Sequence, residues 1–120
     1  MRRSPLRCGL QSPRLGHHGV QLQGQMIGVA AGYTWYGTSE LKQMWIDEAY
    51  RGRGYASVLL NAFVAEAWSR GVRRIWVASY DFQAPGLYEK AGFRRMAEFE
   101  GWPEDHINVV LCKTLSSREN

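Results

Sequence analysis

The fold of this 120-residue chain is decided by residues 41–69, LKQMWIDEAYRGRGYASVLLNAFVAEAWS. Residues 41–46 are typical of a strand and are followed by a short polar turn and a glycine-punctuated loop, RGRG, at residues 51–54. Apolar residues then recur at three- and four-residue spacing through residues 58–69, which predicts a helix. Gly71 follows the last periodic residue, as is typical of a helix end. The stretch therefore predicts a strand, a glycine turn and a helix.

The start of this helix has the features of an anion-binding site. The first amides of a helix have no intrahelical acceptor, and the helix dipole adds partial positive charge there. Glycine lets a ligand approach the backbone, and Arg51 and Arg53 add formal charge, so a phosphate or pyrophosphate is the natural ligand. An ordinary connection with solvated arginines would have the same sequence. The spacing fits neither G-x-x-x-x-G-K-[ST] nor G-x-G-x-x-G, because no Lys-Ser or Lys-Thr follows and Ser57 stands three residues after Gly54.

Composition limits the class of protein and its partners. A chain of 120 residues with 45% hydrophobic residues forms one domain, expected at residues 20–115 with a disordered tail at 116–120. The net charge of +4 suits an anionic ligand and equally suits weak contact with nucleic acid, although the arginines form no run. Cys8 and Cys112 lack metal-ligand spacing and are expected as free thiols of a cytoplasmic protein, with no metal. No apolar run has the length of a membrane span, and the basic N-terminus lacks the hydrophobic region of a secretion signal.

The residues before the deciding stretch predict a hairpin preceded by an irregular segment. Residues 1–19 contain two prolines, three glycines and no sustained periodicity, which is typical of irregular structure. Residues 20–22 and 26–36 are strand-like, with Gly24-Gln25 as the turn between them. We therefore expect a hairpin that leads into the strand at 41–46.

The residues after the helix complete a mixed sheet. Residues 73–79 predict a buried strand, and because a helix connects it to the strand at 41–46, the two strands should be parallel. Pro85 and Gly92 bracket a short helix. Two further strands are expected at residues 93–100 and 107–114.

Two motifs in this order resemble those of the GNAT superfamily of N-acetyltransferases. The loop RGRGYA, residues 51–56, matches [RQ]-x-x-G-x-[GA], the acetyl-CoA pyrophosphate loop of that family. Residues 84–93, APGLYEKAGF, closely resemble the signature A-x-x-L-Y-E-K-x-G-F at the expected distance after the loop. The resemblance covers about residues 26–115 and is greatest to small bacterial members. It implies a mixed α/β fold, with a central mixed sheet, a βαβ crossover at the acetyl-CoA site, flanking helices and reduced N-terminal elements.

The resemblance also implies a reaction, the direct transfer of an acetyl group from acetyl-CoA to a primary amine. Backbone groups of the strand at 41–46 would bind the pantetheine arm, and the loop would hold the pyrophosphate. Tyr88 would protonate the leaving thiolate, although a packed aromatic residue is the alternative. Asp81 stands where many members carry an asparagine, whose amide hydrogen bonds an aspartate cannot donate. The residues assigned to the cofactor are Met44, Trp45, Ile46, Arg51, Gly52, Arg53, Gly54, Tyr55, Ala56, Asp81, Ala84 and Tyr88.

The catalytic base is less restricted by the sequence. Glu40 matches, by position, a glutamate that some protein-acetylating members use to deprotonate a lysine through water. A solvated carboxylate at the start of a strand is the alternative reading of Glu40. Glu98, Glu100 and His106 are further candidates near the expected acceptor side.

Three functions follow, and the acceptor stays unidentified in each. The first is the acetyltransferase. The second is a CoA-binding protein with impaired catalysis, because the helices that begin most family members are not encoded in residues 1–19. The third is a small basic nucleic-acid-binding module, which would carry aromatic and basic residues on one open face. We expect no nucleic-acid or membrane partner, and we predict a homodimer or a protein partner at residues 20–36, where the missing helices would expose apolar sheet surface.

Overall fold

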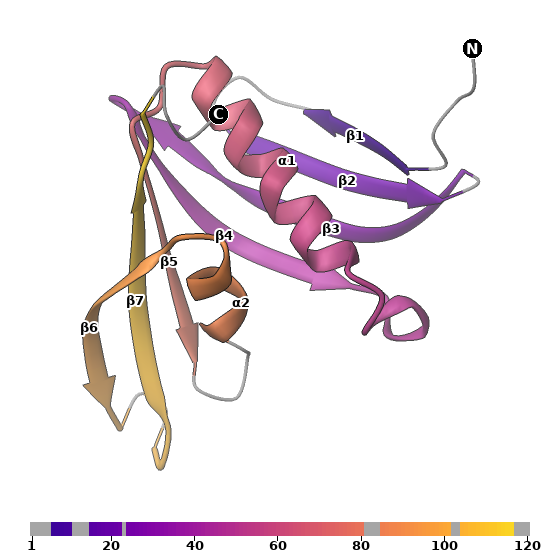
Figure 1. Cartoon of the computed structure of the whole chain (residues 1–120). Helices are drawn as coiled ribbons and strands as arrows, with labels where there is room; N and C mark the ends of the chain where they lie inside the picture. The colour runs from indigo at the N-terminus through magenta and orange to yellow at the C-terminus, as the bar shows by residue number, and fades with distance from the viewer. Residues whose placement is uncertain (1–5, 11–14, 23, 81–84, 102–103, 117–120) are drawn as a thin grey trace.

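One mixed sheet, covered on one face by two α-helices, organises the described part of the chain (Figure 1). The computed structural model describes residues 6–10, 15–22, 24–80, 85–101 and 104–116. The seven strands lie in the order β1-β2-β3-β4-β5-β7-β6. They are β1 (Leu6–Leu10), β2 (Leu15–Leu22), β3 (Gln25–Trp35), β4 (Thr38–Ile46), β5 (Arg74–Tyr80), β6 (Arg94–Glu100) and β7 (Ile107–Thr114), and the helices are the 3-10 turn η1 (Glu48–Tyr50), α1 (Tyr55–Ser69) and α2 (Pro85–Lys90). The mixed α/β fold expected from the sequence is confirmed.

The strands β2, β3 and β4 form an antiparallel meander with tight turns. Gly24, with a φ of +83°, precedes β3 at the predicted hairpin. Between β3 and β4 the turn residues Tyr36 and Gly37 both have positive φ, at 50° and 75°. A two-residue hairpin turn with positive φ at both positions matches the right-handed twist of the strands. The turn lets β4 begin at Thr38, three residues before the predicted strand start at Leu41.

The described residues of the N-terminal segment, 6–10 and 15–19, form strands, contrary to the irregular structure expected from the sequence. β1 pairs antiparallel with β2, from Leu6 opposite Leu22 to Leu10 opposite His18. β2 in turn pairs antiparallel with β3, from Leu15 opposite Tyr33 to Leu22 opposite Gln25. Pairing of strands uses backbone groups, which every non-proline residue supplies, so it needs no hydrophobic alternation. The expectation failed for these residues because it relied on side-chain periodicity.

The connection through α1 makes β4 and β5 parallel, as predicted. The paired segment is short and runs from Thr38 opposite Arg74 to Leu41 opposite Val77. Beyond Leu41 the two strands diverge, so that the sheet opens into a V (Figure 1). The divergence places a gap in the hydrogen-bonded ladder at the centre of the sheet.

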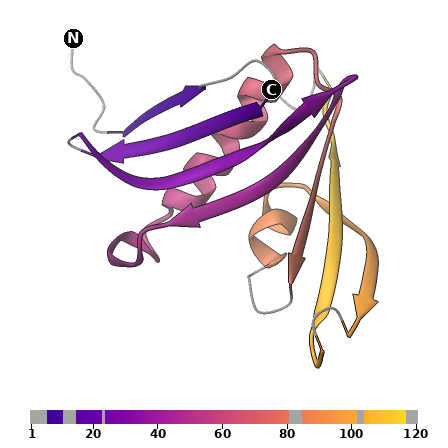
Figure 2. The same ribbon diagram turned by 180° about the vertical axis from the view of Figure 1, so that it is seen from behind.

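The core lies between the sheet and the two helices. α1 packs over β1 to β4, and α2 contacts β6 and β7. Seen from behind, the strands stand in front of α1, and α2 is visible in the opening between β4 and β5, so neither helix of the described residues covers this second face of the sheet (Figure 2). Within the described residues, no helix is long and apolar enough to cross a membrane. The largest fully buried apolar side chains are Ile27, Leu59, Leu60, Val72, Ile75, Val109 and Leu111.

Candidate functional site

A cleft opens where β4 and β5 stop pairing. Its volume is about 110 Å³. Among the described residues, β4 continues to Ile46 beside β3 alone, so its backbone N–H and C=O groups on the side of β5 have no strand partner there beyond Leu41. An extended ligand can hydrogen-bond to such an edge as an added strand does. The cleft is lined by Leu41, Lys42, Gln43, Met44, Val77, Ala78, Ser79, Leu87 and Tyr88.

Tyr88 enters this cleft from α2. The side chain is only 6% exposed, and its ring packs edge-on against Phe93 at 5.7 Å between centroids. Burial removes water from the phenol and raises its pKa above the ordinary value of 10.0. The hydroxyl therefore stays protonated at neutral pH. A buried phenol at the wall of a cleft can donate a hydrogen bond or a proton to a ligand there.

Contacts at the C-terminal end of α2 hold Tyr88 in position. Glu89 accepts two hydrogen bonds from Arg95 of β6, at 2.9 and 3.3 Å, and the interaction raises the pKa of Arg95. At the end of the helix, Lys113 Nζ donates to the Ala91 carbonyl at 2.9 Å. Gly92 then takes a φ of +95°, in agreement with the predicted helix end. The acid candidate is thus fixed by β6 and β7, on the far side of the cleft from β4.

The predicted anion site lies at the start of α1. Gly54 is the N-cap, has a left-handed φ of +83° and supplies no side-chain hydrogen bond to the helix. The first helical bond runs from the Val58 amide to the Gly54 carbonyl, so the amides of residues 55–57 precede the helical ladder. A Cβ built on Gly52 or on Gly54 would meet no atom within 4 Å. The loop is therefore an open cradle of amides, which suits an anion such as a pyrophosphate.

The arginines of the loop are anchored by the strand and by aromatic rings. Arg51 Nε donates to the carbonyl of Ile46, the last residue of β4, at 3.1 Å. The Arg53 guanidinium lies 5.5 Å from the centroid of the Tyr50 ring, which also packs edge-on against Tyr55. Both arginines are exposed, so their charge is available to a ligand at the helix start. The loop and the first turn of α1 contain the cofactor residues expected from the sequence, Arg51, Gly52, Arg53, Gly54, Tyr55 and Ala56.

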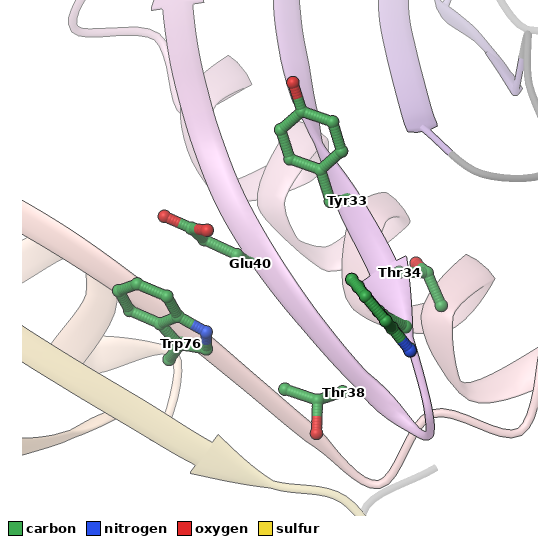
Figure 3. A pocket seen from close by; sticks show the side chains of 6 residues that line it. Tyr33, Thr34, Thr38, Glu40 and Trp76 are labelled. Carbon is green, nitrogen blue, oxygen red and sulfur yellow. The ribbon is translucent and has the colours of Figure 1, made fainter.

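Glu40 lies on the other face of the sheet, beside the point where β4 and β5 part. It stands opposite Trp76 in the last but one register pair before the divergence. Figure 3 shows its carboxylate between Tyr33 and Trp76, which come from the two flanking strands. Lys42 Nζ lies 3.4 Å from Glu40 Oε2, and the Glu40 side chain is 26% exposed. Glu40, Tyr33 and Trp76 belong to an open hollow of about 710 Å³. The hollow is lined by Tyr33, Thr34, Trp35, Thr38, Glu40 and Trp76.

Other residues named from the sequence lie in different places. Met44 lines the cleft, whereas Trp45 stands opposite Val29 on the open face and Ile46 is buried. Asp81 and Ala84 lie outside the described residues.

The remaining base candidates are separated from the cleft. Glu98 is exposed on β6, where it pairs with Arg95 at 3.5 Å. Glu100 is exposed at the end of β6, and the His106 carbonyl accepts from the Gly101 amide just before β7. β5 and β7 stand between β6 and β4, so these groups lie across the sheet from Glu40.

Sequence reasoning missed several residues of the cleft and the hollow. Gln43, Ser79 and Leu87 line the cleft, and Trp76 lines the hollow. The alternation of β5 could have indicated this. Ile75, Val77 and Ser79 are buried and face the helices, which puts Trp76 on the opposite face.

A metal site was not expected, and within the described residues no group of three or more His, Cys, Asp and Glu side chains could hold a metal ion.

Comparisons with known proteins agree with this geometry. The sequence model of the acetyltransferase (GNAT) family matches residues 3–93. The chain is 30% identical over 94 residues to blasticidin-S acetyltransferase of Streptomyces morookaense, covering 78% of this chain and 69% of that relative. The crystal structure of an acetyltransferase from Bacillus cereus superposes with a TM-score of 0.82 and 30% identity, over 88% of this chain and 77% of that one. A GNAT family acetyltransferase from Elizabethkingia anophelis, solved with acetyl-CoA bound, gives a TM-score of 0.74 at 19% identity over 84% and 76% of the two chains.

Proposed function

This chain belongs to the acetyltransferase (GNAT) family, and from that membership we propose that it moves the acetyl group of acetyl-CoA directly to a primary amine. The observation that carries the proposal is the cleft between β4 and β5. It joins an unpaired strand edge to a buried tyrosine, and the strand β4 leads directly into an open amide cradle. An elongated ligand with an anionic end and an amide-containing arm fits such a site.

Two parts of the site would hold acetyl-CoA. The amides at the start of α1, together with Arg51 and Arg53, would bind the pyrophosphate. The free edge of β4 beyond Leu41, including Met44, would hydrogen-bond to the pantetheine arm. When bound, acetyl-CoA supplies an acetyl group activated as a thioester. Positioning of the thioester beside an amine is the main contribution that the protein makes to such a transfer.

Tyr88 would act as the general acid. Acetyl transfer breaks a carbon–sulfur bond, and the departing sulfur needs a proton or a hydrogen bond. Tyr88 lines the cleft, and because burial raises its pKa further above neutrality, its hydroxyl carries a proton at neutral pH. Its burial beside Phe93 also restricts its motion. Tyr88 is therefore the described side chain best suited to this role.

Glu40 would act as the general base. An amine attacks only in its neutral form, so a proton must leave it before or during the transfer. The Glu40 carboxylate lies one register pair from the divergence of β4 and β5, on the face opposite to the helices. Gln43 and Ala78 of the cleft belong to that same face, whereas Tyr88 approaches from the helical face. A ligand in the cleft would thus meet its acid and its base from opposite sides of the sheet.

A CoA-binding protein with impaired catalysis is the alternative function. The uncovered face of the sheet supports it, because no helix in the described residues closes the acceptor side (Figure 2). We also propose a cytoplasmic location, in line with the free thiol of Cys112, and cell fractionation would test it.

Two measurements test the proposal. Calorimetric titration with acetyl-CoA should show binding, and absence of binding would remove the basis of the proposed function. A thiol-release assay against a panel of amines should then show turnover, with lysine peptides, protein N-termini, aminoglycosides and blasticidin S as members. Binding without turnover across the panel would favour the impaired protein.

A further inference from the structure

The open face of the sheet carries side chains in two rows that run across the strands. Residues paired in register on neighbouring strands point to the same face. The register pairs of β3 with β4, β4 with β5, β5 with β7 and β7 with β6 therefore connect into continuous rows. The first row is Tyr33, Glu40, Trp76, Cys112 and Arg94, and the second is Trp35, Thr38, Arg74 and Thr114.

The two ends of these rows carry opposite charge. Glu40 lies at the β4 end, in the hollow of about 710 Å³. At the other end a second hollow, of about 540 Å³, is lined by Arg74, Gly92, Arg94, Met96, Cys112 and Thr114. Trp76 stands between Glu40 and Arg94 in the first row, whereas Arg74 lies beside Trp76 on β5, and the neighbours of Trp76 in the two rows line both hollows. The face is therefore divided into an acidic aromatic part and a basic part.

The two arginines of the second hollow are available to a ligand. Among the described residues, no hydrogen bond or ion pair engages the guanidinium of Arg74 or of Arg94, and both residues are exposed. The neighbouring Arg95 points to the other face and is paired with Glu89 and Glu98. Arg74 and Arg94 flank the strand β7 from either side, so both can reach one anion placed over Cys112. Paired guanidinium groups of this kind favour phosphate or carboxylate.

Strand geometry sets the separation of the two charged ends. With strands about 4.8 Å apart and a rise of about 3.4 Å per residue, Arg74 lies about 8 Å from Glu40 along the diagonal. Arg94 is three strands away, at about 14 Å between backbone positions. A small organic molecule can span such distances.

We propose that this face binds the acetyl acceptor, and that the acceptor is an amine carrying a phosphate or carboxylate on the same molecule. Its amine lies at Glu40 between Tyr33 and Trp76, and its anionic group lies at Arg74 and Arg94. A planar or apolar body covers Trp76 between them. The inference rests on the proposed function, because Glu40 becomes an acceptor site only where the cleft holds the acetyl donor. Lys42 is no obstacle, since its exposed pair with Glu40 is of the kind that contributes little.

A single-stranded nucleic acid is the other ligand that aromatic and basic residues on an open sheet suggest. Glu40 argues against it, because its carboxylate stands in the middle of the aromatic part, where a phosphate chain would be repelled. A molecule with a single anionic group and a cationic amine matches the charges at both ends. The small amphoteric amine is therefore the better match to this face.

Tyramine and tyramine phosphate form a matched pair of probes, since they share the amine and the ring and differ in the phosphate. The wild-type protein should acetylate tyramine phosphate with a kcat/KM at least about tenfold higher, as expected for charge-assisted hydrogen bonds to arginine. Inorganic phosphate added together with tyramine should not reproduce the preference. The double variant Arg74→Met/Arg94→Met should bring the ratio to about one while acetyl-CoA affinity stays unchanged. Arg70→Met is the matched control, because it removes the same charge at the end of α1 and should keep the preference.

Binding of tyramine phosphate can also be measured without acetyl transfer, so that the test of the inference does not depend on the chemical step. Tyramine phosphate added to the CoA-loaded protein should change the tryptophan fluorescence, and the double arginine variant should lose this response. Equal rates for both amines, no fluorescence response at millimolar probe, or tighter binding of a short single-stranded RNA that displaces the probe would each overturn the inference. Failure to bind acetyl-CoA would instead overturn the proposed function, so the two failures are distinguishable.

Discussion

Gly54→Ala tests the anion site with the least disturbance of the fold. A Cβ at residue 54 meets no atom within 4 Å, so the substitution creates no clash inside the protein. The backbone there has a φ of +83°, which costs an L-residue about 1–2 kcal/mol. For a chain of this size that loss corresponds to a fall in Tm of about 4–8 °C. The variant should therefore fold and be moderately less stable.

Acetyl-CoA affinity should fall by more than the stability loss explains. The new methyl group occupies the open space at the helix start, where we place the pyrophosphate. Loss of one charge-assisted hydrogen bond is worth about 1.5–3 kcal/mol. This converts to an increase in Kd of about 10- to 150-fold, measurable by calorimetric titration well below the Tm of the variant.

Gly71→Ala is the matched control. Gly71 follows the same helix at its other end, has a φ of +84° and also has no atom within 4 Å of a built Cβ. Both variants should lose similar stability, and only Gly54→Ala should lose affinity. Wild-type affinity in a folded Gly54→Ala protein, or an equal loss in Gly71→Ala, would refute the placement of the pyrophosphate.

Four further outcomes follow from the site. Tyr88→Phe should lower kcat by about 10²-fold or more and leave acetyl-CoA affinity nearly unchanged, because only the hydroxyl is lost. Full activity of this variant would make Tyr88 a packing residue. Since burial raises the pKa of Tyr88 above 10.0, the pH–rate profile should show no fall in kcat from this acid between pH 7 and 9, and any stability lost through its ionisation should appear only above pH 10. Glu40→Gln should lower kcat/KM by about 10²-fold at neutral pH, and its kcat/KM should approach the wild-type value above the pKa of the amine, where no base is needed. If kcat/KM stays low above that pH, Glu40 contributes to binding of the amine and not to its deprotonation. We also predict a homodimer through residues 20–36, since Met26 and Tyr36 are 38% and 93% exposed and lie outside the hollow at Glu40. Light scattering should show a dimer at micromolar concentration that Tyr36→Glu dissociates, whereas a wild-type monomer would contradict it.

The local elements around the cofactor site could be predicted from the sequence. The strand at 41–46, the glycine loop, the helix α1 and the short helix from Pro85 to Lys90 all depend on short-range spacing and on capping residues. The parallel pairing of β4 with β5 followed from the handedness of a strand–helix–strand connection. These features are encoded within a few residues of where they form.

The long-range features could not be predicted. A shift of register between Ala31 and Gly32 of β3 changes which β4 residues face the open side, and no local pattern announces it. The end of pairing at Leu41 and Val77 depends on how the two halves of the sheet pack, so the cleft was implied by resemblance alone. The rows of side chains across β3 to β6 require the register of four strand pairs at once.

The position of the cleft follows from how the helices divide the sheet. α1 covers β1 to β4, whereas α2 lies against β6 and β7, so each helix holds its own group of strands. Within the described sheet, the two groups of strands are hydrogen-bonded to each other along β4 and β5, where four residue pairs are in register. The cradle at the start of α1 belongs to the first group, and Tyr88 on α2 belongs to the second. A ligand that fills the cleft between β4 and β5 would thus contact both groups of strands. On the other face of the sheet, the same divergence of β4 and β5 opens at Glu40 onto the uncovered side.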